Sequence, residues 1–402
     1  MTVCSYCPLL CEFTENESPD CELRNRCGRK HTIANRDLVP RIDGQPASID
    51  AAIAMANRLL ACSKKQRISG RIRSVEASRA VLAIASRIGA LVDPSNSEDA
   101  FKSIQAIQRS GMISASMSEV RFRSDCVVLI GDERLLESYP RLPHVLLVRP
   151  QSRLLASPRR VIAMGKWSAE SIRLLRSSGS EVCSIEIDID RVPQSLFQWS
   201  RCTSDARTGT ENCVSHWMTE ARYLSVVWSA GQLKMPHADL WIERLYEWIA
   251  DRNIHSRCVG FPLASDYVTF QQVCTWITGF PGRVTIEGNA FDYDPSASRG
   301  THYVTTDDTF VALQIDESLC DSVDVVTRES PTILIAPEID VTTQAPRVFI
   351  PCGVAGIDHN ATFFRVDGTV AVEIHENASA AEKSLQLSAV EILSKLGVPA
   401  EC

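Results

Sequence analysis

Short apolar segments alternate with helix-length amphipathic segments along most of the chain after residue 48. This alternation constrains the fold more than any other feature of the sequence. It is typical of βαβ units, in which helices join parallel strands and cover the sheet. The sequence therefore predicts an α/β fold built from several βαβ units with parallel sheets.

Capping residues help to place the individual elements. Ser48 precedes the first expected helix and Gly89 follows the second, as an N-cap and a left-handed C-terminal residue should. Helices are expected at residues 49–60, 75–88, 98–109, 168–177, 210–222, 238–250, 267–278 and 380–396. Strands are expected at residues 67–72, 90–93, 126–130, 145–148, 161–164, 181–187, 223–228, 258–261, 309–315, 332–335 and 348–350.

The length of the chain indicates more than one domain. Its 402 residues exceed the roughly 250–300 at which a single hydrophobic core stops growing. The expected division is a Cys-rich cap at 1–48, a first α/β domain at 49–193, a second at 194–300 and a C-terminal α/β segment at 301–402 that completes the fold. Because the cap is polar and short, we expect a metal, disulfides or a docking surface to order it.

Five of the 15 cysteines lie within the first 27 residues. Cys4, Cys7 and Cys11 follow a C-x2-C-x3-C spacing that lets three thiolates wrap one face of an iron–sulfur cluster, which a fourth cysteine closes. We predict Cys4, Cys7, Cys11 and Cys27 as the metal ligands, with Cys21 as the alternative fourth ligand. The same sulfur set suits tetrahedral zinc, so [4Fe–4S] and zinc are both candidates. A motif that has lost its metal is the third alternative.

The start of the chain and its apolar runs indicate a cytoplasmic protein. Met1 is not followed by the basic start and apolar core of a signal peptide, and no run reaches the roughly 20 apolar residues of a membrane helix. Cytoplasmic thiols stay reduced, which favours metal binding over a disulfide framework for the early cysteines. The formal net charge of −7 argues against a general nucleic-acid-binding surface.

The other candidate residues point to packing more than to chemistry. His31 is a candidate neighbour of the metal site, and His359, in a loop opened by Gly356, is the best candidate for a functional imidazole, although a structural role is favoured for both. Cys352 remains unexplained. Five cysteines in or beside expected elements should pack in the core as small hydrophobic residues: Cys62, Cys126, Cys183, Cys258 and Cys274.

Phosphate-binding sequence motifs are absent. The sequence contains no G-x-G-x-x-G, no P-loop and no H-E-x-x-H. Two turns after expected strands carry acidic or bulky residues instead, at Gly131-Asp132-Glu133 and Gly260-Phe261-Pro262. Such residues would repel or block a dinucleotide phosphate, which needs close approach to free backbone amides.

Several segments, together with the cysteine pattern, resemble a known family. They are residues 92–93, 124–131, 272–281, 293–295 and 348–368. The chain resembles the B subunit of formylmethanofuran dehydrogenase, which has the molybdopterin oxidoreductase fold, and above all its relative in the bacterial formyltransferase/hydrolase complex. The resemblance implies that Cys4, Cys7, Cys11 and Cys27 correspond to the cluster cysteines of the redox-active members.

The resemblance also implies a position for the molybdenum or tungsten ligand, near Ser97–Ala100. This stretch reads Ser-Glu-Asp-Ala and has no sulfur, and the histidine-glycine pair that normally follows the ligand is missing. Asp99 lies about where the ligand belongs. We therefore expect a chain that keeps the fold without molybdopterin and without its own catalytic activity.

The resemblance implies a role in one-carbon metabolism. The related complex moves a formyl group from tetrahydromethanopterin to a methanofuran-type carrier and hydrolyses it to formate. The chemistry belongs to a hydrolase and a formyltransferase, which small subunits accompany, so this chain is expected to be a non-redox scaffold that meets the carrier indirectly. The alternative is a redox-active formylmethanofuran dehydrogenase chain with molybdopterin, an iron–sulfur cluster and Asp99 as an unusual metal ligand.

Overall fold

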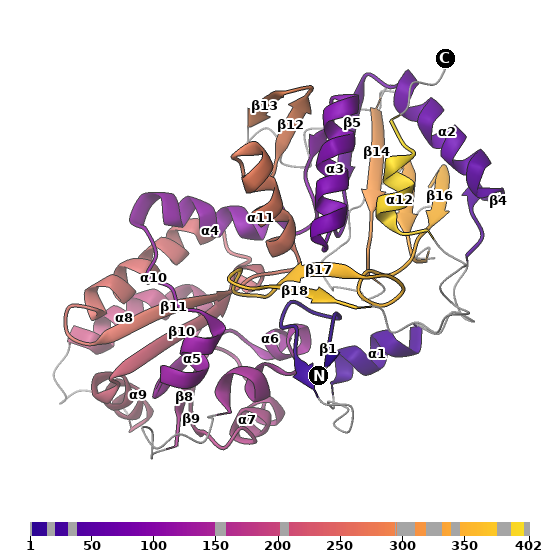
Figure 1. The fold of residues 1–402 in the computed structure, drawn as a ribbon. Coiled ribbons are helices and arrows are strands. Elements are labelled where there is room, and N and C mark those ends of the chain that lie inside the picture. The colour runs from indigo at the N-terminus through magenta and orange to yellow at the C-terminus, as the bar shows by residue number, and fades with distance from the viewer. Residues whose placement is uncertain are drawn as a thin grey trace. The chain divides into compact units, whose positions relative to one another are not determined.

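The structure is a computed structural model, and it describes residues 2–13, 21–30, 38–148, 158–201, 209–293, 295, 310–318, 332–338, 346–375 and 387–397. These residues form two compact units. Unit 1 comprises Met1–Ser97 and Asp266–Cys402, and unit 2 comprises Glu98–Ser265. Each unit has its own large β-sheet (Figure 1).

Unit 2 is built on a five-stranded sheet in which all neighbouring strands are parallel, in the order β11-β10-β7-β8-β9. The strands are β7 (Cys126–Ile130), β8 (Arg160–Met164), β9 (Glu181–Ile185), β10 (Tyr223–Ser229) and β11 (Arg257–Leu263). All five residues of the central strand β7 are buried. A parallel strand covered on both faces needs such an unbroken apolar run, which is why the sequence shows no alternation there.

Helices and helical turns connect the strands of unit 2. The α-helices are α4 (Ser97–Ser110), α5 (Met117–Arg123), α6 (Glu133–Ser138), α7 (Ala169–Arg176), α8 (Val192–Arg201), α9 (Gly209–Glu220) and α10 (Ala238–Arg252). The shorter turns are η2 (Pro143–Leu147), η3 (Ile189–Arg191) and η4 (Ala230–Gln232). At the start of α5, the Ser116 hydroxyl accepts a hydrogen bond from the Glu119 N–H, and the Glu119 carboxylate accepts one from the Ser116 N–H. Each side chain thus pairs a backbone N–H that has no partner within the helix.

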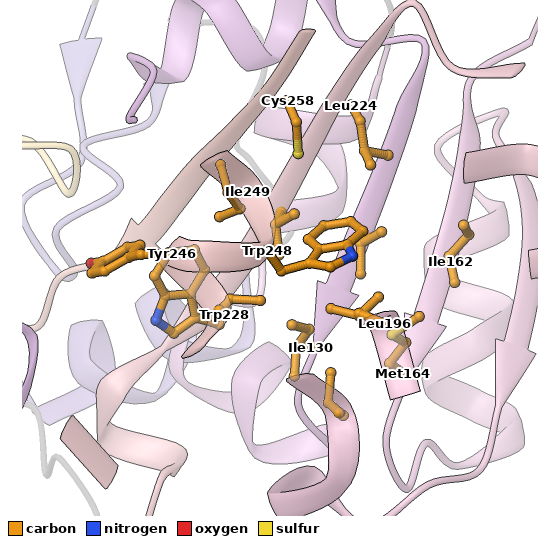
Figure 2. Close-up of a cluster of buried hydrophobic side chains, with 14 of the residues drawn as sticks. Ile130, Ile162, Met164, Leu196, Leu224, Trp228, Tyr246, Trp248, Ile249 and Cys258 are labelled. Atoms are coloured by element: carbon orange, nitrogen blue, oxygen red, sulfur yellow. The ribbon is translucent and has the colours of Figure 1, made fainter. Parts of the chain in front are cut away.

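The core of unit 2 combines aliphatic side chains from the sheet with aromatic side chains from β10 and α10 (Figure 2). Trp228 and Trp248 are both fully buried. The Trp228 ring meets the Tyr246 ring edge to face, with centroids 5.7 Å apart. On β11, a Cβ added at Gly260 would lie 3.0 Å from the Trp228 ring, so a larger residue there would push the indole out of place.

Unit 1 is built on a nine-stranded mixed sheet in the order β13-β12-β6-β5-β14-β15-β16-β3-β4. The five strands from β6 to β16 run parallel, and antiparallel pairs flank them on both sides. The strands are β3 (Arg41–Ile42), β4 (Gln45–Pro46), β5 (Lys65–Ser69), β6 (Leu91–Val92), β12 (Val284–Glu287), β13 (Ala290–Tyr293), β14 (Phe310–Ile315), β15 (Ile333–Ala336) and β16 (Val348–Pro351).

The remaining elements of unit 1 are helices and two small hairpins. The helices are α1 (Glu22–Lys30), α2 (Ile49–Cys62), α3 (Val75–Ile88), α11 (Tyr267–Thr278) and α12 (Ala389–Ser394). The hairpins pair β1 (Thr2–Val3) with β2 (Glu12–Phe13) and β17 (Ala361–Phe364) with β18 (Ala371–Ile374). Helix α3 packs against both α11 and α12, and α2 packs against β16 (Figure 1).

The α/β fold predicted from the sequence is confirmed, and most expected elements lie within a few residues of their predicted bounds. The strand expected at 145–148 is wrong: residues 145–147 belong to the π-helical turn η2, which begins at Pro143, and Val148 directly follows it. A four-residue apolar run fits a buried helical turn as well as a strand, so periodicity could not separate them. The expected helix at 380–396 corresponds in part to α12, and residues 380–386 lie outside the described residues.

The division into units differs from the four contiguous segments expected at 1–48, 49–193, 194–300 and 301–402. Strands from before residue 93 and from after residue 310 share the sheet of unit 1, so this unit is discontinuous in sequence. Local sequence patterns carry no information on such long-range pairing. Within the described part of the chain, no helix has the length and apolar character needed to span a membrane.

Candidate metal centre

The first three predicted ligands lie on one short hairpin, in the loop that joins β1 to β2. The Cys4 N–H donates a hydrogen bond to the Cys11 carbonyl at 2.9 Å. The Leu10 N–H donates to the Cys7 carbonyl at 3.2 Å, and Leu10 adopts the left-handed backbone conformation, with φ of 46°. These contacts fold the loop back on itself, so Cys4, Cys7 and Cys11 share a single turn.

The thiols of this N-terminal cap are buried and influence one another. Cys4, Cys7, Cys11 and Cys21 are each less than a tenth exposed. Burial raises the pKa of Cys7 well above its ordinary value, and the Cys11, Cys4 and Cys21 thiols add to the rise. Burial also raises the pKa of Cys4, with a further contribution from Cys21. The structure thus brings Cys21, which directly precedes α1, near the C-x2-C-x3-C turn.

The predicted fourth ligand, Cys27, lies in α1 and is 1% exposed. Its sulfur is disulfide-bonded, whereas Cys4, Cys7 and Cys21 have free thiols. Within the described ranges, no three His, Cys, Asp or Glu side chains are arranged to hold a metal ion as they stand. Metal binding by Cys4, Cys7, Cys11 and Cys27 therefore stays a prediction, with Cys21 as the alternative fourth ligand.

Backbone amides point at two of the cap sulfurs. The Tyr6 N–H hydrogen-bonds the sulfur of Cys4 and the Leu9 N–H hydrogen-bonds the sulfur of Cys7, and each bond lowers the pKa of the thiol that it contacts. Amide hydrogen bonds to sulfur stabilise thiolates and tune iron–sulfur clusters. The soft donor set and these amides fit a thiolate-bound metal, provided that the side chains turn toward a common centre.

Two arginines place positive charge beside the cap. The Arg24 guanidinium lies 4.5 Å from the centre of the Phe13 ring. Arg73 is buried and donates to the Ser5 carbonyl at 2.8 Å. Both charges lower the pKa of Cys4, against the larger effect of burial. A metal held by four thiolates carries net negative charge, which these arginines would offset.

The cap packs against the rest of unit 1 through the β17–β18 hairpin and the loop before it. The Val366 N–H donates to the Pro8 carbonyl at 2.7 Å. Leu10 closes a small apolar cluster that contains Ala355, Ala361, Phe363 and Ile374. A small pocket beside this cluster is lined by Pro8, Leu10, Arg73, Asp266, Val268, Thr269, Phe363 and Phe364. A docking surface, one of the three expected ways of ordering the cap, is therefore present.

Three curated proteins match segments of the chain, while no protein-family model matches it. The B subunit of the formyltransferase/hydrolase complex Fhc from Methylorubrum extorquens is 30% identical over 91 residues, which cover 23% of this chain and 25% of that protein. The B subunit of tungsten-containing formylmethanofuran dehydrogenase 2 is 26% identical over 133 residues in Methanocaldococcus jannaschii, and 24% identical over 161 residues in Methanococcus maripaludis. The chain is a distant homologue of these B subunits. The Methanocaldococcus match covers 32% of this chain and 31% of that protein, and the Methanococcus match covers 39% and 36%. The chain therefore spans less than two thirds of the length of each of these three relatives.

The fold matches over nearly the whole chain. A chain in the crystal structure of the formyltransferase/hydrolase complex FhcABCD from Methylorubrum extorquens, solved with methylofuran, superposes with a TM-score of 0.73. The match covers 89% of this chain and 97% of that chain, at 19% sequence identity. The resemblance to B subunits predicted from the sequence is therefore confirmed at the level of distant homology and fold.

Asp99, the residue expected at the molybdenum or tungsten position of redox-active B subunits, is engaged in an ion pair. It lies in the first turn of α4, and its carboxylate is 2.9 Å from the Lys102 ammonium. Lys102 also donates to the Leu233 carbonyl at 3.2 Å. The carboxylate is therefore neutralised within unit 2, an arrangement that does not favour metal coordination.

The end of β6, after which the metal ligand was expected, is occupied by a buried ionic cluster. Asp93 lies 3.0 Å from Arg67 and 3.5 Å from Arg283, and it accepts the Ser97 hydroxyl at 2.6 Å. Asp93 and Arg283 are each 5% exposed. Buried charges are retained when they are paired and hydrogen-bonded, as here.

The remaining predicted candidates are accounted for mainly by packing. The His359 carbonyl accepts the Gly356 N–H at 2.9 Å, so His359 helps to close its loop. His31 lies outside the described residues. Cys352 is fully buried, and its thiol donates to the Asp316 carbonyl at 3.7 Å. Core packing is confirmed for Cys126, Cys258 and Cys274, whereas Cys183 is half-buried and Cys62 is exposed at the end of α2, so the core prediction for Cys62 is wrong.

Sequence reasoning missed the polar residues that organise unit 1, namely Arg73, Asp316 and Glu317. All three are buried. Their only sequence signal is position: Arg73 precedes the Ser74 N-cap of α3, and Asp316-Glu317 directly follows the apolar strand β14. Carboxylates at the carboxyl end of a parallel strand are the signal that could have indicated them.

Proposed function

We propose that the chain is the B subunit of a formyltransferase/hydrolase complex in tetrahydromethanopterin-linked one-carbon metabolism. The observation that carries this proposal is the fold match to a chain of the FhcABCD complex, which extends over 89% of this chain and 97% of that one. The sequence match to the Fhc B subunit of Methylorubrum extorquens supports the assignment of this chain as the B subunit of such a complex. The proposed complex transfers a formyl group to a methanofuran-type carrier and hydrolyses it to formate.

Within that complex the chain acts mainly as a non-redox scaffold in the cytoplasm. It holds the hydrolase, formyltransferase and small subunits in place and meets the carrier only through them, without a catalytic residue of its own. The pairing of Asp99 with Lys102 supports this role, because it engages the carboxylate that lies where the redox-active relatives are expected to bind their metal. The ion pairs of Asp93 support it in the same way.

The cap contributes a metal site, with Cys4, Cys7 and Cys11 as ligands and either Cys21 or, once its disulfide is reduced, Cys27 as the fourth. A [4Fe–4S] cluster would supply electron transfer, and zinc would supply a structural crosslink. In either case metal binding stabilises the cap, because thiolates buried together repel one another until a cation joins them.

The proposal is tested by anaerobic co-expression with the hydrolase, formyltransferase and small subunits of such a complex. We expect a stoichiometric complex that contains this chain, with iron and sulfide or zinc but without molybdenum, tungsten or pterin. Formyl transfer and formate release should fall when the chain is omitted, because the scaffold is then missing. Replacing Asp99 by Ala should leave the activity of the complex unchanged.

Three results would contradict different parts of this proposal. Failure to co-purify with the partner subunits would remove the assignment to the complex. Stoichiometric pterin with molybdenum or tungsten, together with formylmethanofuran oxidation that is lost in Asp99→Ala, would establish the redox-active dehydrogenase alternative. Absence of iron and zinc would show that the cysteine motif has lost its metal.

A further inference from the structure

The parallel core of the unit 1 sheet has a point where its connections change direction. In the order β6-β5-β14-β15-β16, the chain passes from β5 to its neighbour β6 on one side and later returns to β14 on the other. Ligands of such sheets bind outside the carboxyl ends of the two strands at this switch point. A ligand of unit 1 would therefore be expected between the exits of β5 and β14, at the start of α3 (Figure 1).

The backbone itself closes this position. Gly70, directly after β5, has a φ of 104°, and a Cβ added there would lie 2.2 Å from the Ile315 carbonyl oxygen at the end of β14. The Glu317 N–H then donates to the Arg71 carbonyl at 3.2 Å. The two strand exits are thus in direct contact, and Gly70 is needed for this close approach.

The Glu317 side chain fills the anion-binding position at the start of α3. Its carboxylate accepts the N–H groups of Arg73 at 2.7 Å and Ser74 at 2.8 Å, and the Ser74 hydroxyl at 2.6 Å. Glu317 is 1% exposed. Backbone amides at a helix N-terminus, together with the helix dipole, are the groups that bind phosphate in α/β proteins. In this chain the Glu317 carboxylate accepts the hydrogen bonds that these amides would otherwise donate to a phosphate.

The neighbouring carboxylate closes the rest of the loop. Asp316 accepts the Arg71 N–H at 2.8 Å and pairs with the Arg71 guanidinium at 3.6 Å. Arg73 pairs with Asp266 at 3.2 Å. Three carboxylates therefore face two guanidinium groups around residues 70–74. Asp316 and Asp266 are each paired with one of these guanidinium groups, so Glu317 is the carboxylate that holds the donors at the start of α3. A phosphate group entering here would have to displace Glu317 from those donors, which is unfavourable in a buried site.

We propose that Glu317 is an internal anion that permanently closes the switch point of unit 1, so that a phosphate-bearing cofactor such as a pterin dinucleotide does not fit there. This inference rests on the proposed non-redox role and gives it a structural cause. It also makes the fold of unit 1 independent of any such cofactor.

The inference is tested by opening the site with Glu317→Ala in the purified complex and measuring melting temperature against phosphate concentration. Potassium chloride at equal ionic strength corrects for general salt effects. We expect phosphate to raise the melting temperature of Glu317→Ala, because the vacated amides bind the anion and stabilisation grows with the logarithm of its concentration. Formate and acetate should act similarly, since each restores a carboxylate.

Three control proteins sharpen the measurement. Wild type should show no response to phosphate beyond that to chloride, since its site is filled. Glu317→Gln should behave like wild type, because its amide occupies the same volume. Glu373→Ala, which removes an exposed carboxylate of β18, should also show no response.

A phosphate response in wild type equal to that of Glu317→Ala would overturn the inference, as would the absence of a response in Glu317→Ala. If Glu317→Ala does not fold unaided, refolding in phosphate or formate replaces the melting experiment: recovery supports the internal-anion role, and no recovery overturns it. Co-purification with partner subunits reports separately on the proposed function. A complex that assembles normally while Glu317→Ala shows no phosphate response would therefore contradict only the inference.

Discussion

Cysteines are buried in two different surroundings in this chain, the N-terminal cap and the core of unit 2. In the cap, Cys4 and Cys7 lie near other thiols and accept hydrogen bonds from backbone amides. In unit 2, Cys126 and Cys258 lie in a core of aliphatic and aromatic side chains, and Cys258 can be seen there in Figure 2. Burial is the largest cause of the raised pKa of both thiols. Burial alone therefore does not distinguish a metal-binding cysteine from a packing one; the polar neighbours do.

The largest effect is expected from a substitution in the cap. Cys7→Ser should reduce the metal content of the anaerobically purified complex to background, because hydroxyl oxygen is a poor ligand for a soft metal site. Metal analysis checks this outcome, with Cys126→Ser as the matched substitution of a buried core cysteine. If both variants lose metal, or if neither does, the distinction between the two surroundings is wrong.

The second prediction concerns the core of unit 2. Trp248→Ala should lower the free energy of unfolding by about 3–5 kcal/mol, because it leaves a large cavity in a close-packed interior. Trp248 is fully buried and also donates to the Ser200 hydroxyl at 3.0 Å. Denaturant unfolding measures the loss. Ile254→Ala, at a residue that is 72% exposed, should change stability by no more than about 0.5 kcal/mol.

Trp248→Ala also tests whether the N-terminal cap is independent of the core of unit 2. Because the cap is docked on unit 1, Trp248→Ala should leave the metal content of the folded protein unchanged. Loss of metal from the folded variant would show that the cap depends on the core of unit 2.

The third prediction concerns the protonation of a core thiol. Burial raises the pKa of Cys258 from 9.0 to about 12. Between these values the folded chain keeps a proton that the unfolded chain releases. The resulting stability is fully present below pH 9 and is lost as pH rises toward 12, by about 1.4 kcal/mol per pH unit.

Cys258→Ala should remove this contribution, so its stability should fall less steeply with pH than that of wild type over this window. Unfolding curves at several alkaline pH values provide the test. Cys62→Ala, at an exposed cysteine, serves as the control and should keep the slope of wild type. An unchanged slope in Cys258→Ala would mean that the core thiol ionises as freely as it does in the unfolded chain.

The smallest effects are expected at two matching helix caps, one in each unit. Ser116 in unit 2 and Ser388 in unit 1 both form reciprocal hydrogen bonds with the third residue of their helices. Replacing either serine by Ala should cost about 1 kcal/mol. Thermal unfolding checks the magnitude, and hydrogen exchange shows which unit is weakened. A cap substitution that weakened the opposite unit instead would contradict the division of the chain into two compact units.

Much of this architecture could be predicted from local sequence signals. The predicted ranges 75–88 and 267–278 match α3 and α11, and Gly89, the predicted C-terminal signal of α3, adopts the left-handed conformation. The structure adds the N-cap Ser74 of α3 and the left-handed Gly279 that ends α11. The apolar run at 126–130 predicted β7 correctly, because a central parallel strand is buried on both faces and therefore consists of apolar residues. The apolar run at 145–148 did not predict the structure correctly, because a buried helical turn and a strand have the same apolar composition over four residues.

The candidate site was predicted only in part, for a related reason. The spacing of Cys4, Cys7 and Cys11 is local, so sequence alone could group them. The fourth ligand cannot be chosen from spacing, because it depends on how α1 packs against the hairpin. The structure places Cys21 near Cys4 and Cys7 and buries Cys27 almost completely, so both remain candidates.

The sequence by itself determined the α/β class, most helices and strands and the existence of a cysteine-rich cap, since each depends on side chains a few residues apart. Only the tertiary structure decided how the strands group into two sheets and which charges meet inside them. Glu317 lies 244 residues after Arg73 and 243 after Ser74, yet its carboxylate accepts their N–H groups. Buried polar groups need hydrogen-bond partners, and the fold can supply those partners from distant parts of the sequence. Local sequence patterns therefore cannot predict such contacts.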